Sequence, residues 1–379
     1  MGLCFSGAPS LHSSSLNRPH YPGASDIHGS NVEFSETTTT TEIRKRQFSV
    51  RESIYSDYSP LPFTHGQILK WPELKVFSFE ELKSATRNFM SDRLVGEGEF
   101  CRVYKGWLDE NTLTPATPGS GVEVAIKMFN PECDHGFSQW QSEVNFLGRL
   151  SQPNVIRLLG YCWDEDQFLL VYDEFMPNGS LECHLFETRN HSTEPLSWNT
   201  PLKIAKGAAR GLAFLHANEN KVIFRDFNTS NILLDENYDA KISDFGIAKL
   251  GPSEGQSHVT TKLMGTYGYA APEYVIRGKL YVKSDVYGFG VVLLEILTGL
   301  RAHDRRRPTG KEDLVDWTIP CFSEKLKSIM DGRIKDQISP MAALESAQLI
   351  MKCLEHIPEL RPSMEQVLQG LDAIQHIHS

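Results

Sequence analysis

The chain has no long hydrophobic run. Its most apolar stretch, residues 286–297 of 379, contains Glu295. It is too short to cross a membrane, because a spanning helix needs about 18 or more consecutive apolar residues. We therefore expect a buried core helix there and no transmembrane segment. The N-terminus also lacks the charged region and apolar core that mark a secretory signal, so we expect none.

Positive charge and patterned cysteines are also scarce. The chain has 38 Lys and Arg against 48 Asp and Glu, a formal net charge of −10. Nucleic-acid phosphates attract basic surfaces, so this balance argues against a nucleic-acid partner. The 7 cysteines are odd in number and scattered. They show no metal-ligand spacing, which favours reduced thiols in a cytosolic protein over a disulfide framework.

The chain opens with the residues MGLCFS, which match the pattern that exposes Gly2 for N-myristoylation once Met1 is removed. A single myristoyl chain binds membranes only weakly, so stable anchoring needs a second signal. Cys4 would supply that signal as a palmitoylation site, helped by the basic residues between 44 and 51. The alternative is a chance match. We predict lipidation at Gly2 and Cys4.

Residues 1–76 are rich in Ser, Thr, Pro and His and have little apolar periodicity. This composition is typical of a disordered tether; the alternative is a small domain without a clear pattern. Order is expected from Ser78, which forms a capping box with Glu81 and starts a short helix. Leu82, Ala85 and Phe89 would share one face of that helix.

The rest of the chain, residues 77–372, is predicted to form one large domain followed by a short tail, 373–379. Its first part, to about 174, shows strand patterns at 122–128, 155–160 and 168–172, and an amphipathic helix at 137–147. From about 175 onward the patterns are mainly helical, at 202–215, 284–297 and 342–354. A strand-rich part followed by a helix-rich part predicts an α+β fold of two lobes with a cleft between them.

The strand-rich part carries residues suited to holding phosphates. Gly96-Glu97-Gly98 follows an apolar strand and would fold over phosphates, although an ordinary hairpin has the same pattern. Lys127 comes about 25 residues later, and Glu143 on the next helix is a candidate ion-pair partner. The alternatives are a solvated strand lysine and an exposed helix charge.

The strongest signal is a pair of motifs in the helix-rich part. Asp226 is followed by Asn231, and Asp244-Phe245-Gly246 begins 13 residues later. One carboxylate can accept a hydroxyl proton while an amide and a second carboxylate share Mg²⁺. The tripeptide Ala-Pro-Glu, ending at Glu273, follows downstream. Together these motifs indicate phosphoryl transfer.

With Ser284-Asp285 and Arg361, these residues resemble the eukaryotic protein kinases from about 78 to 372. Finer phrases, such as FSFEEL at 77–82, resemble the receptor-like cytoplasmic kinases of plants, especially their immune-signalling subfamily. The resemblance implies a serine/threonine kinase that uses ATP and Mg²⁺, with Mn²⁺ as a substitute. It also implies attachment to the cytoplasmic face of the plasma membrane, protein substrates, upstream receptor kinases and a monomer.

The resemblance also implies a role for each matching residue. Asp226 would be the catalytic base, Lys127 would bind phosphate while paired with Glu143, and Thr266 would face the substrate residue. Asn231 and Asp244 would hold Mg²⁺. The nucleotide contacts would come from Gly96, Glu97, Gly98, Val103, Ala125, Lys127, Glu174 and Met176. Activation-segment phosphate would pair with Arg225, from one of the hydroxyls Ser253, Ser257, Thr260 and Thr261. Structural support would come from Glu273, Asp285 and Arg361.

Four departures from the kinase pattern concern catalysis. Cys101 replaces the third glycine of the phosphate loop, Phe224 precedes Arg225, and the hinge at 170–176 is one residue longer than usual. Asn228 stands where serine/threonine kinases carry lysine, and losing one such charged contact typically costs ~10²–10³ in rate. The alternative function is therefore a membrane-tethered adaptor with weak or no catalysis.

Overall fold

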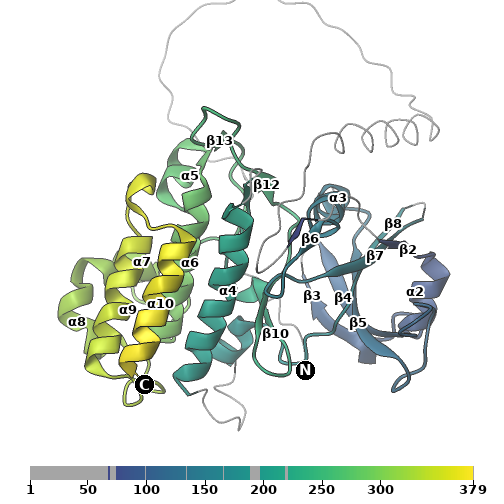
Figure 1. The fold of residues 1–379 in the computed structure, drawn as a ribbon, viewed down its shortest axis with the longest axis horizontal. Helices are drawn as coiled ribbons and strands as arrows, with labels where there is room; N and C mark the ends of the chain where they lie inside the picture. The colour runs from purple at the N-terminus through teal and green to yellow at the C-terminus, as the bar shows by residue number, and fades with distance from the viewer. Residues whose placement is uncertain are drawn as a thin grey trace, which may run out of the picture.

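The computed structural model describes residues 67–68, 74–98, 100–133, 135–164, 166–187, 197–217 and 221–378. They form a strand-rich lobe and a helical lobe (Figure 1), which confirms the predicted two-lobed α+β architecture. Nearly all of the predicted tether, including Gly2 and Cys4, lies outside the described residues. Among the described residues, no helix is both long and apolar enough to cross a membrane.

A six-stranded sheet forms the smaller lobe, with strand order β2-β7-β8-β5-β4-β3. Strand β2 pairs in parallel with β7, and the other neighbours are antiparallel. The long helix α3 packs against this sheet (Figure 1). The elements of this lobe are β1 (Gln67–Ile68), β2 (Lys75–Val76), α2 (Phe79–Ala85), η1 (Ser91–Arg93), β3 (Leu94–Glu97), β4 (Cys101–Leu108), β5 (Val122–Phe129), α3 (Gly136–Leu147), β6 (Leu150–Ser151), β7 (Leu158–Asp164) and β8 (Gln167–Tyr172).

Helix α2 begins as the sequence predicts. The Ser78 backbone amide donates to Glu81 Oε2 (2.8 Å), and the Glu81 amide donates to Ser78 Oγ (3.2 Å), so the capping box is complete. The expected position of Phe89 was wrong. Phe89 lies past the end of the helix at φ 50°, where its ring contacts those of Phe79 and Tyr104 at 5.6 and 5.2 Å.

One predicted strand is displaced along the chain. The pattern at 155–160 predicted a strand, but the sheet strand β7 runs from Leu158 to Asp164. Val155 instead forms an isolated bridge with Ile242, and the Ile156 amide donates to the Ile242 carbonyl (2.9 Å). The apolar side chain of Val155 is therefore buried against the segment of Ile242 rather than in the sheet. The apolar pattern alone could not distinguish these two kinds of burial.

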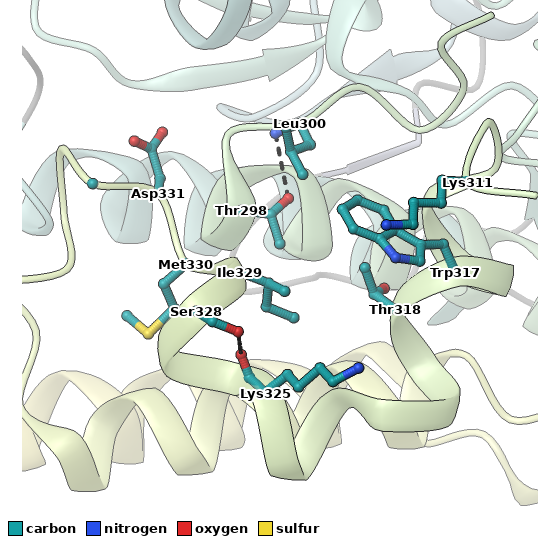
Figure 2. A pocket seen from close by; sticks show the side chains of 11 residues that line it. Thr298, Leu300, Lys311, Trp317, Thr318, Lys325, Ser328, Ile329, Met330 and Asp331 are labelled. Carbon is teal, nitrogen blue, oxygen red and sulfur yellow. Dashed lines mark hydrogen bonds between the residues drawn. The ribbon is translucent and has the colours of Figure 1, made fainter. Parts of the chain in front are cut away.

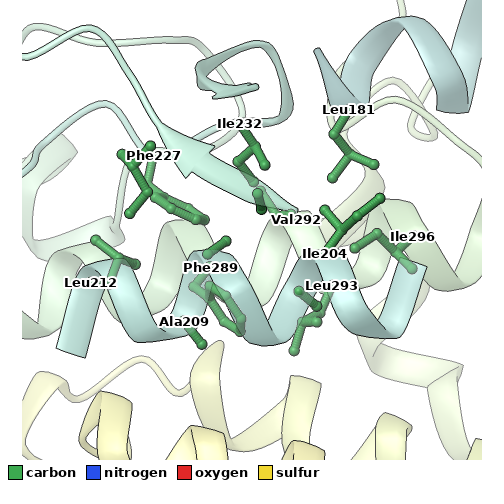
Figure 3. Packing of buried hydrophobic residues seen from close by; sticks show 14 of the residues in the cluster. Leu181, Ile204, Ala209, Leu212, Phe227, Ile232, Phe289, Val292, Leu293 and Ile296 are labelled. Carbon is green, nitrogen blue, oxygen red and sulfur yellow. The ribbon is translucent and has the colours of Figure 1, made fainter. Parts of the chain in front are cut away.

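The larger lobe is built around α6, whose residues are all buried from Ser284 to Thr298. This confirms the buried core helix predicted from the hydrophobic run. Figure 3 shows the side chains that fill the space between α4 and α6, among them Leu212 and Phe289. Phe227 adds a ring 5.6 Å from that of Phe289. The helical elements are η2 (Cys183–Glu187), α4 (Asn199–Ala217), η4 (Thr229–Asn231), α5 (Pro272–Arg277), α6 (Val282–Thr298), α7 (Leu314–Thr318), η5 (Ile319–Cys321), α8 (Phe322–Ile329), α9 (Pro340–Cys353), η6 (Pro358–Leu360) and α10 (Met364–His378).

Short strand pairs in this lobe position its loops. β10 pairs with β11, β12 with β9, and β13 with β14, all antiparallel. The sequence predicted a short tail from residue 373. This was wrong for residues 373–378, because α10 continues to His378 and buries Ile374 on its inner face. The strands are β9 (Val222–Ile223), β10 (Ile232–Leu234), β11 (Ala240–Ile242), β12 (Lys249–Leu250), β13 (Val259–Thr260) and β14 (Lys279–Leu280).

Candidate active site

A buried ion pair joins the sheet to helix α3. Lys127 on β5 places Nζ 2.6 Å from Glu143 Oε1, and Glu143 is 0% exposed. The Tyr172 hydroxyl donates to the other carboxylate oxygen, Glu143 Oε2, at 2.7 Å. Burial of both charges excludes the alternatives of a solvated lysine and an exposed helix charge.

Lys127 also reaches the Asp-Phe-Gly motif. Its Nζ lies 3.2 Å from Asp244 Oδ1. Burial lowers the pKa of Lys127, but the carboxylates of Asp244 and Glu143 outweigh burial and hold that pKa well above its ordinary value. Lys127 therefore stays protonated at physiological pH, as a phosphate-binding cation must. Asp244 has φ 68°, a left-handed conformation that is uncommon for a residue other than glycine.

Asp226 is held by the segment that carries Thr266. Its Oδ1 accepts hydrogen bonds from the Thr266 amide (2.8 Å) and the Thr266 hydroxyl (2.7 Å). Asn231 Nδ2 donates to the Asp226 carbonyl (2.9 Å) and more distantly to Oδ2 (3.3 Å). Burial raises the pKa of Asp226, and the Thr266 hydroxyl partly offsets this. A carboxylate in this setting is a stronger base than one in water.

Asn228 is a buried structural residue, only 2% exposed. It is the N-cap of η4: its Oδ1 accepts from the amides of Ser230 (2.9 Å) and Asn231 (3.2 Å). Its Nδ2 donates to the Asp226 carbonyl and to Thr266 Oγ1, both at 3.0 Å. Asn228 therefore orders the loop that carries Asp226, here called the catalytic loop, and links it to the segment that carries Thr266, here called the activation segment, but it brings no charge.

Asp285 on α6 accepts hydrogen bonds from the backbone that leads into Asp226. Its two carboxylate oxygens accept from the amides of Phe224 (2.8 Å) and Arg225 (2.7 Å). His216 Nε2 lies 2.9 Å from Asp285 Oδ2. Arg225 has φ 76°, an unfavourable conformation for a side chain with a Cβ, so these hydrogen bonds hold a strained turn in place.

Glu273 and Arg361 form a bidentate ion pair. Arg361 Nη1 and Nη2 lie 2.8 and 2.7 Å from Glu273 Oε1 and Oε2. Arg361 is 1% exposed, and Ser284 Oγ also donates to Glu273 Oε1 (2.8 Å). The three structural residues of the prediction therefore lie in two buried networks.

Aromatic side chains connect α3, the catalytic loop and the Asp-Phe-Gly motif. The Phe224 ring packs edge-on against Phe245 at 5.1 Å, and both are fully buried. Ser142 Oγ on α3 donates to the Phe245 carbonyl at 2.8 Å. Phe224 thus fits the position where kinases usually have histidine or tyrosine.

The glycine-rich segment is a tight antiparallel hairpin beside Lys127. The Gly98 amide donates to the Cys101 carbonyl (2.8 Å), and Val103 on β4 pairs directly with Lys127 on β5. Burial raises the pKa of the Cys101 thiol to about 11, so it is neutral at physiological pH. The hairpin geometry agrees with both sequence interpretations, and the position next to Lys127 favours the phosphate loop.

The two acidic side chains of the longer hinge, Asp173 and Glu174, lie in different environments. Glu174 forms an ion pair with Lys241, and burial raises the pKa of Asp173 to about 6. The Met176 carbonyl accepts from the Gly179 amide at 3.1 Å. Among the described residues, the Met176 amide donates no backbone hydrogen bond, and adenine binding by Glu174 and Met176 remains a prediction.

Asn231 and Asp244 suit a magnesium ion chemically. The side-chain nitrogen Nδ2 of Asn231 donates to the Asp226 carbonyl. The side-chain oxygen Oδ1 of Asn231 is therefore the atom left for a cation. Asp244 adds a carboxylate, and oxygen ligands are what Mg²⁺ and Mn²⁺ prefer. Among the described residues, no cluster of three or more His, Cys, Asp or Glu side chains could hold a metal alone. An ion here would complete its shell with phosphate and water oxygens.

Three contacts of the site had no signal in the sequence: Tyr172 on Glu143, Ser142 on Phe245, and His216 on Asp285. Each joins residues at least 29 positions apart. Tyr172 ends an apolar strand and Ser142 lies within a helix, so both look like ordinary members of those elements.

Comparison with known proteins finds relatives along the whole chain. The family described as "Protein tyrosine and serine/threonine kinase" matches residues 89–371. The chain is 51% identical to "Probable serine/threonine-protein kinase CST" of Arabidopsis thaliana, over 100% of this chain and 89% of the relative. It is 48% identical to "Probable serine/threonine-protein kinase PBL10" of Arabidopsis thaliana, over 100% and 87%. It is 53% identical to "Receptor-like cytoplasmic kinase 176" of Oryza sativa subsp. japonica, over 83% and 80%.

Proposed function

Because the chain belongs to the receptor-like cytoplasmic kinases, a group of serine/threonine protein kinases, we propose that it is a lipid-anchored kinase at the cytoplasmic face of the plasma membrane, acting directly downstream of receptor kinases in plant immune signalling. The catalytic part of this proposal is supported by one arrangement above all: Lys127 lies between Glu143 and Asp244, and Asp226 is hydrogen-bonded to Asn231.

In the proposed chemistry, Asp226 orients the substrate hydroxyl and accepts its proton. Oδ1 already accepts two hydrogen bonds from Thr266, whereas Oδ2 has only the long contact with Asn231. Oδ2 is therefore the oxygen that takes the proton. Lys127 binds phosphate oxygens, held by Glu143, and Asn231 and Asp244 supply oxygens to Mg²⁺. When bound, ATP supplies the transferred phosphoryl group and Mg²⁺ neutralises its charge.

The test is transfer of radiolabelled phosphate by the purified chain with ATP and Mg²⁺. We expect incorporation into serine or threonine, reduced ~10²–10⁴-fold in Asp226→Ala, because removing a positioned base typically costs that much. Asp239→Ala, at an exposed carboxylate of the turn between β10 and β11, should retain activity. Equal background signal from the parent chain and Asp226→Ala would refute the catalytic assignment. It would also favour the adaptor alternative, which the kinase names of the relatives do not support.

Among the candidate phosphorylation sites, we propose Thr261. Arg225 Nη2 lies 3.4 Å from Thr261 Oγ1, whereas Thr260 lies on β13 and is exposed. Burial lowers the pKa of Lys249, and the Arg225 charge lowers it further, so two cations lie close together here. A phosphate on Thr261 would form charge-assisted hydrogen bonds with Arg225 and order the segment that carries Thr266.

An upstream receptor kinase can be tested with the inactive Asp226→Ala chain as its substrate. We expect a receptor kinase domain to phosphorylate Thr261, detected by mass spectrometry, with the signal lost in Asp226→Ala/Thr261→Ala and kept in Asp226→Ala/Thr260→Ala. Phosphate at Thr260 alone would contradict the choice of Thr261.

The membrane anchor depends on Gly2 and Cys4. After co-expression with an N-myristoyltransferase, we expect the chain to sediment with lipid vesicles and Gly2→Ala to remain in the supernatant. Cys4→Ser should weaken binding to membranes from plant cells, where palmitoylation occurs, because one acyl chain anchors only weakly. Membrane association that survives Gly2→Ala would refute the anchor.

A further inference from the structure

The helical lobe contains a pocket that no part of the proposed catalytic mechanism uses. Its volume is about 450 Å³, and it lies between the C-terminal end of α6, the helix α7 and the helix α8 (Figure 2). In Figure 1, α7 and α8 lie at the end of the helical lobe away from the sheet lobe. None of the catalytic, nucleotide or metal residues lines this pocket, so an occupant would leave the active site open.

The pocket has a mixed lining with an apolar part. The Trp317 ring and Ile329 face it from α7 and the end of α8 (Figure 2). The hydroxyls of Thr298 and Thr318 also line it, but each donates at 2.7 Å to the backbone carbonyl four residues earlier. Trp317 and Ile329 therefore offer a surface for an apolar side chain, and the two threonine hydroxyls beside them are already used.

Two lysines stand at the rim. Lys311 and Lys325 are exposed and come from different sides of the pocket (Figure 2). Within the described ranges, neither ammonium group has a carboxylate within 4 Å. Lys311 Nζ lies 5.3 Å from the centre of the Trp317 ring.

The acidic residue that lines the pocket is already paired with a cation of its own. Asp331 lines the pocket, but Arg333 Nε lies 2.8 Å from its Oδ2. Neither Asp313 nor Asp316 lines the pocket. Asp313 Oδ2 lies 3.8 Å from His303 Nδ1, and the charges of Asp313 and Asp316 add to the effect of burial in raising the pKa of Tyr287. The charged residues that line the pocket are thus Lys311, Lys325 and the Asp331 that Arg333 already pairs, so the lining itself is positive on a chain whose formal net charge is −10.

We propose that this pocket is a docking site for a linear segment of a partner protein that carries one aromatic side chain flanked by acidic residues. The aromatic ring packs against Trp317 and Ile329, where aromatic pairs are favourable. Acidic residues on either side of the ring pair with Lys311 and Lys325. Charge complementarity selects this partner over a neutral apolar segment. It also selects against a basic segment, whose charge the lysines would repel.

The experiment uses the full chain and a fluorescein-labelled peptide containing the sequence Glu-Asp-Trp-Glu-Asp, with binding followed by fluorescence anisotropy. We expect saturable binding that weakens about tenfold or more in the double variant Lys311→Glu/Lys325→Glu. The matched control is Lys327→Glu, an exposed lysine of the same helix α8 that does not line the pocket. It should bind nearly as well as the parent chain.

Two further arms make the result decisive. A peptide with glycine in place of tryptophan should bind about tenfold more weakly or worse, and equal binding would mean that charge alone attracts the peptide, which overturns the proposal. Absence of saturable binding, or equal weakening by Lys327→Glu, would overturn it as well. The Asp226→Ala chain should bind the peptide normally, so a failure of docking is distinguishable from a failure of the catalytic proposal.

Discussion

Asn228 carries two functions on one side chain. As an N-cap it accepts hydrogen bonds from Ser230 and Asn231, and as a donor it connects the carbonyl of Asp226 to Thr266. The sequence indicated only what this residue lacks, the positive charge of the usual lysine. The structure shows what it contributes, which is order in the catalytic loop.

Replacing Asn228 by lysine should therefore change rate and stability in opposite directions. We expect Asn228→Lys to raise kcat by about tenfold or more, because it restores a charge near the transferred phosphate. Loss of the cap should cost about 1 kcal/mol of unfolding free energy, or roughly 2 °C in Tm. Steady-state kinetics and differential scanning calorimetry measure the two effects. Asn228→Ala is the control, with the lost cap and no gain in rate; an unchanged kcat in Asn228→Lys would refute the electrostatic account of this position.

At the scale of elements, α6 supports both loops that form the site. Asp285 near its start holds the catalytic loop, and Glu295 near its end holds the activation segment. Glu295 Oε2 accepts from the Tyr269 hydroxyl (2.7 Å) and Oε1 from the Ala302 amide (2.6 Å). Burial raises the pKa of Glu295 to about 8, against an ordinary value of 4.5. The helix thus carries a carboxyl group that stays protonated at neutral pH.

This carboxyl group predicts a pH-dependent stability. Between pH 4.5 and about 8 the unfolded chain has released the Glu295 proton while the folded chain retains it. The contribution of Glu295 to the free energy of unfolding is therefore fully present below pH 4.5 and is lost as pH rises to about 8. The loss is on the order of a few kcal/mol. Urea unfolding at pH 5.5, 7 and 8.5 should show Glu295→Gln gaining stability relative to the parent chain as pH rises.

The control for this prediction is Glu236→Gln, at an exposed position in the loop between β10 and β11. It should follow the parent chain at every pH. A constant difference between Glu295→Gln and the parent chain across the pH series would show that Glu295 is not the group responsible.

At the scale of the whole molecule, the two lobes share one site. Lys127 and Glu143 belong to the sheet lobe, Asp226 and Asn231 to the helical lobe, and Asp244 joins them through its 3.2 Å contact with Lys127. Nucleotide and metal bound as proposed would therefore contact both lobes together. Such a ligand stabilises the folded chain in proportion to the logarithm of its concentration.

We expect ATP with Mg²⁺ at about 100 times its Kd to add ~2.7 kcal/mol to the free energy of unfolding, or roughly 5 °C or more in Tm. Adding EDTA, or making the variant Asp244→Asn, should remove most of this increment, because the charged metal ligand is then lost. Thermal-shift measurements with and without Mg²⁺ provide the test, and Asp239→Asn is the matched control. Equal increments with and without Mg²⁺ would contradict metal binding at Asp244.

The sequence by itself determined the class of the fold, most of its long helices, and the chemistry of the site. Periodic apolar residues must be buried, which located α4, α6 and α9 to within a few residues. Phosphoryl transfer needs particular side chains at short fixed spacings, and Asp226, Asn231 and Asp244 lie close enough in sequence to be recognised together. These constraints act over short distances in the sequence, so a single sequence is enough to detect them.

Tertiary structure alone decided the contacts between distant segments. The hydroxyl of Tyr172 on Glu143, the hydroxyl of Ser142 on Phe245 and the pairing of Val155 with Ile242 instead of the sheet depend on how the lobes pack. The pocket at Trp317 likewise exists only where α6, α7 and α8 meet. The physical reason is that a side chain's burial and partners are set by elements from elsewhere in the chain, and no local pattern records which elements those are.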